Sequence, residues 1–215
     1  MKNKKIVFIS LILLLAGFFA VSSFYKQNKV EELSSMSSDG APFIRDHSPV
    51  FGNKNSKVTV VEWLDPECGS CRAFHPAVKK VLNEYKDEIK LVIRYVPNHA
   101  NSEYMIKILG AAGKQNLYNE VLEVIYYYQP VWADHKNPKP KLIWTYLENV
   151  KGLDLAKLKE DFNDPIFIDQ LNLDRIDGQT LKVRATPEFF VNGKLLEDFS
   201  YKGLLNLVES EIYKN

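Results

Sequence analysis

The sequence has little cysteine and almost no net charge. Its 215 residues include two cysteines, Cys68 and Cys71, and 28 basic against 27 acidic residues give a formal net charge of +1. Two cysteines this close cannot form the disulfide scaffold of a small secreted protein, because a bridge between them would close a very short loop. The balanced charge and the lack of a glycine-rich phosphate-binding loop argue against nucleic-acid and nucleotide partners.

Long apolar runs are also scarce, apart from one at the N-terminus. Residues 6–21 are almost entirely apolar and follow Lys2, Lys4 and Lys5. This order is typical of an export signal, and we favour an uncleaved membrane anchor over a cleaved signal peptide. We therefore expect an anchor at 1–25, a flexible polar linker at 26–45 and a domain at 46–215 that lies outside the cytoplasm, at the membrane surface.

The order of the expected elements indicates an α/β fold. A buried strand at 57–64, a helix at 69–85 and a second buried strand at 90–96 form a βαβ unit, which requires a parallel strand pair. A helical block of about 100–178 follows, and then a hairpin turning at Asn192-Gly193 and a helix at 201–213. Within the block we expect helices at 102–113, 116–128, 139–150, 154–162 and 165–175.

The two cysteines are separated by Gly69 and Ser70 and fall where the first strand gives way to a helix. A helix N-terminus stabilises a thiolate, so Cys68 is expected to be an exposed, acidified nucleophile and Cys71 a buried resolving thiol. A structural zinc site needs four ligands, and the four histidines have no recognisable ligand spacing. A thiolate copper carrier remains a less favoured alternative, because Cu(I) prefers soft sulfur ligands.

Three further positions bear on this chemistry. Glu62 interrupts an apolar strand, so it is either a buried proton acceptor for a thiol or a partly exposed edge residue. Thr186-Pro187 directly precedes a strand, which is typical of a cis peptide or a rigid turn; a cis bond would leave the backbone of Thr186 free to pair with an extended substrate. His99 is expected in a surface loop, with an approach to the cysteines as the alternative.

The segments VVEWLDPECGSCRAFHP and RATPEFFVNG, with Pro76 inside the helix and the helical block between them, resemble the DsbA-like branch of the thioredoxin superfamily. The resemblance covers about residues 48–213. It implies a thioredoxin-like fold, in which βαβ and ββα halves surround a central mixed sheet and an all-helical insertion separates them. It also implies Cys68 as nucleophile, Cys71 as resolving thiol, Glu62 as buried acid and Pro187 as the cis-proline opposite the disulfide. No cofactor or metal is implied besides the redox-active disulfide.

The resemblance implies an enzyme that exchanges disulfides with exported protein thiols, most readily as an oxidase reoxidised by a membrane partner. Strongly oxidising members carry Pro-His between the cysteines, so Gly69-Ser70 indicates a less oxidising disulfide. Thr186 resembles reductase and isomerase relatives, which keeps those directions open. Residues 26–45 are too few to supply the N-terminal dimerisation domain of such isomerases, and this favours a monomer.

Overall fold

The computed structural model describes residues 43–214 of the chain. The expected anchor at 1–25 and most of the linker at 26–45 lie outside these residues. Within 43–214, no helix has both the length and the apolar character that a membrane crossing requires.

A five-stranded mixed sheet forms the centre of the molecule, in the order β1-β3-β2-β4-β5. β2 and β3 are parallel, whereas β1 pairs with β3, β4 with β2 and β5 with β4 in antiparallel fashion. The strands are β1 (Val50–Gly52), β2 (Val58–Leu64), β3 (Ile89–Tyr95), β4 (Glu188–Val191) and β5 (Lys194–Leu195). The expected mixed sheet with its parallel βαβ unit is confirmed.

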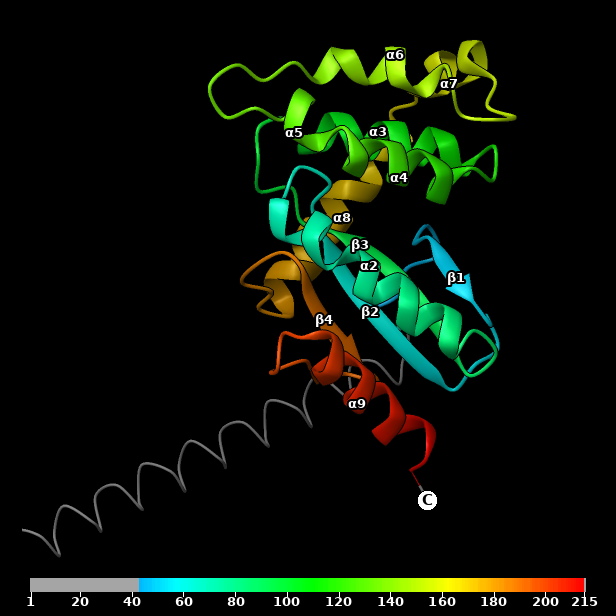
Figure 1. The fold of residues 1–215 in the computed structure, drawn as a ribbon, viewed down its shortest axis with the longest axis vertical. Coiled ribbons are helices and arrows are strands. Elements are labelled where there is room, and N and C mark those ends of the chain that lie inside the picture. Colours follow the sequence, from blue (N-terminus) through cyan, green and yellow to red (C-terminus); the bar gives the residue numbers. More distant parts are fainter. Residues whose placement is uncertain (1–42, 215) are drawn as a thin grey trace, which may run out of the picture.

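Helices surround the sheet and extend beyond one of its ends (Figure 1). α2 and α9 pack on one face, α8 covers the other, and α3 to α7 form a helical block (Figure 1). The helical segments are α2 (Gly69–Glu84), α3 (Ser102–Gly113), α4 (Tyr118–Tyr127), α5 (Gln129–Trp132), η1 (Pro140–Leu142), α6 (Ile143–Leu147), α7 (Leu155–Asp161), α8 (Ile166–Thr180) and α9 (Tyr201–Ile212). The thioredoxin-like α/β fold with a helical block between its two halves is confirmed.

The central strand β2 shows why the fold forms two apolar layers. Side chains alternate between the faces of a strand, so Val60 and Leu64 join the core beneath α2, while Val61 and Trp63 join the core on the opposite side. Both layers are buried, which explains the nearly continuous apolar character of the strand. By the same alternation Glu62 faces the side of α2, where the two cysteines lie.

The N-terminal strand β1 was not predicted. It is three residues long and pairs Val50 with Val92 at the edge of the sheet, which is too short for a periodic pattern. α8 also extends five residues beyond its predicted end at 175. Asp177 and Gly178 resemble a turn in the sequence, but Asp177 is bound by Arg94, and the lack of a side chain at Gly178 lets the helix approach Trp63.

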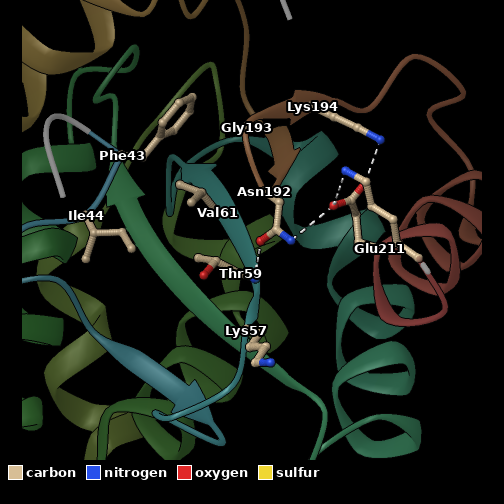
Figure 2. Close-up of a pocket in the computed structure, with 10 residues that line it drawn as sticks. Phe43, Ile44, Lys57, Thr59, Val61, Asn192, Gly193, Lys194 and Glu211 are labelled. Carbon is tan, nitrogen blue, oxygen red and sulfur yellow. Dashed lines mark hydrogen bonds and ion pairs between the residues drawn. The ribbon is translucent and has the colours of Figure 1, made fainter. Parts of the chain in front are cut away.

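The C-terminal hairpin turns at Asn192-Gly193 as predicted, with φ values of 47° and 80°. A pocket of about 370 Å³ lies beside this turn, and Figure 2 shows the residues that line it. In it, the Asn192 side chain accepts from the backbone N–H of Thr59 at 2.8 Å and donates to Glu211 at 3.1 Å. Thr59 lies at the start of β2, whereas Cys68 follows the end of that strand, so this pocket belongs to the opposite end of the sheet.

Candidate active site

Cys68 and Cys71 lie on the first turn of α2. Cys68 is the N-cap residue, with extended backbone angles of φ −69° and ψ 122°, and its carbonyl accepts from the N–H of Arg72 at 3.2 Å. Cys68 therefore lies at the N-terminus of α2, as the sequence predicted, where free backbone N–H groups favour an anion. Pro76 lies inside the same helix. Both thiols are free in this structure.

Cys68 is less accessible than expected. Its exposed fraction is 8%, against 0% for Cys71, so the prediction of an exposed Cys68 is wrong. The loop before β4 accounts for part of this burial: the sulfur of Cys68 lies 3.2 Å from the carbonyl oxygen of Thr186, to which it donates when it is protonated. The Thr186–Pro187 peptide bond is cis, one of the two conformations expected there. Residues from the two ends of the domain thus meet at one sulfur.

The two thiols have opposite acidities. A hydrogen bond from the Cys71 thiol is the largest influence that lowers the pKa of Cys68 to about 5; burial opposes it, and backbone N–H groups of Cys71 and Ser70 add to the lowering. Burial is also the main reason why the pKa of Cys71 is raised far above its ordinary value, with the hydrogen bond to Cys68 and the nearby Glu62 adding to it. At neutral pH the pair therefore holds a thiolate at Cys68 and a thiol at Cys71.

Glu62 is buried beneath the pair. Its exposed fraction is 2%, and Oε1 has no hydrogen-bond partner among residues 43–214, so its interpretation as a partly exposed edge residue is wrong. Burial raises the pKa of Glu62 to about 8. A carboxyl group with this pKa can both donate and accept a proton near neutral pH, which is what a proton carrier for the buried sulfur needs.

Asp65 organises the approach to the cysteines and was not identified from the sequence. Its fully buried carboxylate accepts from the backbone N–H groups of Glu67 at 2.8 Å and Asn98 at 2.7 Å, and from the Ser102 hydroxyl at 2.5 Å. His99 Nδ1 is 2.7 Å from the same carboxylate. His99 lies in an exposed loop, as preferred from the sequence, and it also approaches the active-site segment, which was the alternative.

Gln129 joins the helical block to the active-site loop. This buried side chain comes from α5 and donates from Nε2 to the carbonyl oxygens of Pro66, at 2.9 Å, and Cys68, at 3.1 Å. Nothing in the sequence marks this glutamine, because its partners are backbone groups 63 and 61 residues away. The helical block thus fixes the backbone on which the reactive sulfur is carried.

The residues singled out from the sequence come together in one place. Cys68 contacts Thr186, the cis bond to Pro187 follows directly, and Glu62 acts electrostatically on Cys71. Within residues 43–214, no group of three or more His, Cys, Asp or Glu side chains is arranged to hold a metal ion.

The chain is similar in sequence to two kinds of known protein. The chain is 27% identical over 200 residues to disulfide bond formation protein D of Bacillus subtilis, covering 86% of this chain and 85% of that protein. It is also 26% identical over 151 residues to the Na⁺/H⁺ antiporter NhaA of Herminiimonas arsenicoxydans, covering 70% of this chain. The chain spans only 23% of the length of that antiporter.

Two solved structures share the fold. Oxidised BdbD of Bacillus subtilis superimposes with a TM-score of 0.68 at 24% identity, covering 77% of this chain and 93% of that one. The thiol-disulfide exchange protein α-DsbA2 of Wolbachia pipientis gives a TM-score of 0.67 at 22% identity, covering 86% and 98%. The expected DsbA-like architecture is confirmed by these similarities. A family model described as thioredoxin matches residues 45–210, and the chain therefore belongs to the thioredoxin family.

Proposed function

We propose that this chain is a thiol–disulfide oxidoreductase that acts outside the cytoplasm and donates disulfides to exported proteins. The observation that carries the proposal is the position of Cys68: it is the N-cap residue of α2, and its acidified sulfur lies 3.2 Å from the carbonyl oxygen of Thr186. The relative named disulfide bond formation protein D supports the same chemistry, because the match covers most of both chains.

In the oxidase direction, the resting enzyme carries a Cys68–Cys71 disulfide. A substrate thiolate attacks the sulfur of Cys68, which forms a mixed disulfide and releases Cys71, and Cys71 takes up a proton. A second substrate thiolate then attacks the substrate sulfur of the mixed disulfide and releases Cys68 as a thiolate. Two substrate thiols thus become one disulfide, two electrons reduce the enzyme, and one of the two protons remains on Cys71.

The acidities of the two sulfurs suit these steps. A thiol of low pKa is a good leaving group, so a Cys68 pKa of about 5 favours both its release and the reduced form of the enzyme. Cys71 must gain a proton as it leaves and lose one when it resolves a mixed disulfide. Glu62, with a pKa of about 8 and no hydrogen-bond partner for Oε1 among the described residues, is the proposed proton carrier.

The contact at Thr186 suggests how the substrate is held. In the reduced enzyme the Cys68 thiol donates to the carbonyl oxygen of Thr186. In the disulfide form this donor is absent, so the same oxygen could accept from the N–H of an extended peptide that attacks Cys68. We propose that Thr186 and Pro187 form the substrate-binding edge of the site. Recognition through backbone groups depends little on the substrate sequence, which suits an enzyme acting on many exported proteins.

The cellular setting follows from the N-terminal sequence. The proposal places an uncleaved anchor at residues 1–25, the domain on the outer side of the cytoplasmic membrane, and a membrane redox partner that reoxidises the thiols. The chain is proposed to act as a monomer. The anchor and its orientation are supported by the lysines and the apolar run that follows them.

The proposal is tested with the oxidised full chain in detergent, mixed with reduced, unfolded ribonuclease in the absence of oxygen. We expect stoichiometric oxidation of ribonuclease thiols and recovery of its activity, and no recovery with the Cys68→Ser variant. Reduction of insulin by a dithiol at a rate that depends on Cys68, without ribonuclease oxidation, would instead assign the reductase direction. Retention of one Cu(I) per chain without any disulfide exchange would overturn the enzyme in favour of a copper carrier.

A further inference from the structure

The segment between the cysteines carries no positive charge, since it consists of Gly69 and Ser70. A cation from elsewhere in the fold would therefore be needed for any ion-pair stabilisation of the Cys68 thiolate. His99 reaches this region from the loop that follows β3. Its Nδ1 lies 2.7 Å from Oδ2 of Asp65, and its side chain is 35% exposed.

Asp65 connects the histidine to the reactive cysteine. The backbone N–H of Cys68 donates to the carbonyl oxygen of Asp65 at 3.0 Å, which closes a tight turn just before α2. The side chain of the same residue holds His99, so one residue fixes both groups. The Asp65 carboxylate is fully buried, and a buried carboxylate is stable only when it is paired and hydrogen-bonded. His99 is a group near it that can carry a positive charge.

The electrostatic surroundings favour the charged form of the ring. Burial alone would lower the pKa of His99, but the hydrogen bond to Asp65 and the negative charges of Asp65, Cys68 and Glu67 outweigh burial and raise it. All three of these groups are acidic. Glu67 is itself held near the same loop by the backbone N–H and side chain of Asn101, at 2.6 and 2.9 Å.

We propose that His99 is a positioning residue for disulfide exchange: fixed by Asp65, its imidazolium stabilises the thiolate of Cys68 from outside the Cys-Gly-Ser-Cys segment. The inference rests on the proposed function for its role in turnover. When two substrate thiols reduce the disulfide, two protons are released, of which Cys71 takes one. The second passes to the imidazole of His99 or to solvent, and the newly formed thiolate favours its retention on the ring.

The first experiment replaces the histidine in the reduced full chain. Glutamine in His99→Gln can still donate to Asp65 but cannot carry a charge. We expect the rate of Cys68 alkylation by iodoacetamide at pH 5 to fall about three- to tenfold, with no change at pH 9, where the thiol is ionised without help. The matched control is His75→Gln, since His75 lies on α2 itself but pairs with Glu123 at 2.9 Å. An unchanged alkylation profile in His99→Gln would overturn the inference.

The second experiment follows the ring itself by NMR titration of the full chain. Coupling between two ionising groups is reciprocal, so the pKa of His99 must fall when the Cys68 thiolate is lost. We expect the same fall on oxidation and in the reduced Cys68→Ser variant. His75 should not respond. A His99 pKa that is equal in all three proteins would contradict the inference, even if the His99→Gln variant were misfolded.

Neither readout depends on disulfide exchange with a protein substrate. If the ribonuclease experiment fails while the His99 titration depends on the redox state, the proposed function is wrong. The interaction between His99 and the Cys68 thiolate is then still supported. If ribonuclease is oxidised but alkylation and titration are unaffected, the enzyme stands and the role of His99 is wrong.

Discussion

The carbonyl oxygen of Thr186 lies 3.2 Å from the sulfur of Cys68, although 118 residues separate them in the chain. The antiparallel pairing of β4 with β2 produces this contact, because Glu188 pairs with Trp63 near the end of β2 that leads to the cysteines. The peptide segment before β4 is thereby placed against the N-terminus of α2. The reactive sulfur and the proposed substrate-binding edge are positioned by the same strand pair.

The order of the sulfur chemistry can be tested by trapping. In a Cys71→Ser variant, a mixed disulfide at Cys68 has no internal thiol to resolve it. We expect this variant to accumulate a 1:1 covalent complex with a thiol-containing substrate after activation with a small disulfide, detected by non-reducing electrophoresis and mass spectrometry. The Cys68→Ser variant should form no such complex, because its remaining sulfur is fully buried. Equal trapping by both variants would contradict the assignment of Cys68 as nucleophile.

The low pKa of Cys68 makes the stability of the reduced protein depend on pH. A folded-state pKa of about 5 lies below the unfolded value of about 8.5, so the stabilisation is fully present above the unfolded pKa and is lost as the pH falls through about 5. We expect the unfolding free energy of the reduced wild type, relative to reduced Cys68→Ser, to rise between pH 5 and 8.5. The rise should not exceed about 1.4 kcal/mol per pH unit. Urea unfolding at each pH measures the difference in unfolding free energy between the two proteins. A difference that does not change with pH would refute the low pKa of Cys68.

Glu62 gives the opposite dependence. Its folded pKa of about 8 lies above the ordinary value. Its contribution to the unfolding free energy is therefore fully retained below the unfolded pKa of about 4.3, and it declines as the pH rises through 8. Glu62→Gln removes the ionisable group and with it this loss of stability at rising pH. We therefore expect the variant to gain stability over the wild type as the pH rises from about 4.5 to 8, measured on the oxidised proteins so that neither thiol titrates. At the same time, disulfide exchange by the variant should slow, because Cys71 loses its proton carrier.

Gln129 is expected to hold the active-site loop in place. Gln129→Ala leaves the carbonyl oxygens of Pro66 and Cys68 without this donor, and we expect a loss of about 1–3 kcal/mol in the unfolding free energy. Amide hydrogen exchange should also accelerate in residues 65–68. The matched control is Gln115→Ala, a half-buried glutamine whose solvent-exposed hydrogen bonds join it to the backbone of Asp154, and for which we expect a change within about 0.5 kcal/mol. Equal effects of the two substitutions would show that Gln129 has no special role.

The sequence predicted most of the framework because its signals are local. The apolar strand ending at Leu64, the helix beginning after Cys68 and the Asn192-Gly193 turn are each determined by neighbouring residues. The approach of Thr186 to Cys68 could be predicted because a family resemblance related the two ends of the domain. Local periodicity alone would not have joined them.

The parts that were missed depend on distant partners. Asp65 looks like a helix-breaking loop residue until Asn98, His99 and Ser102 are brought to its carboxylate by the parallel pairing of β2 and β3. The burial of Cys68 was missed because part of it comes from a loop 118 residues away. Such polar networks have no periodic signature, because each member is defined by the tertiary structure and not by its neighbours in the chain.

The most direct measurement of the central claim is the redox equilibrium of Cys68 and Cys71 in the full chain, set against glutathione buffers and followed by mass spectrometry of alkylated thiols. The account predicts a reversible two-electron couple with a potential between about −270 and −120 mV. It also predicts that the couple is lost in either cysteine variant. Two thiols that stay independently titratable, with no internal disulfide at any glutathione ratio, would contradict it.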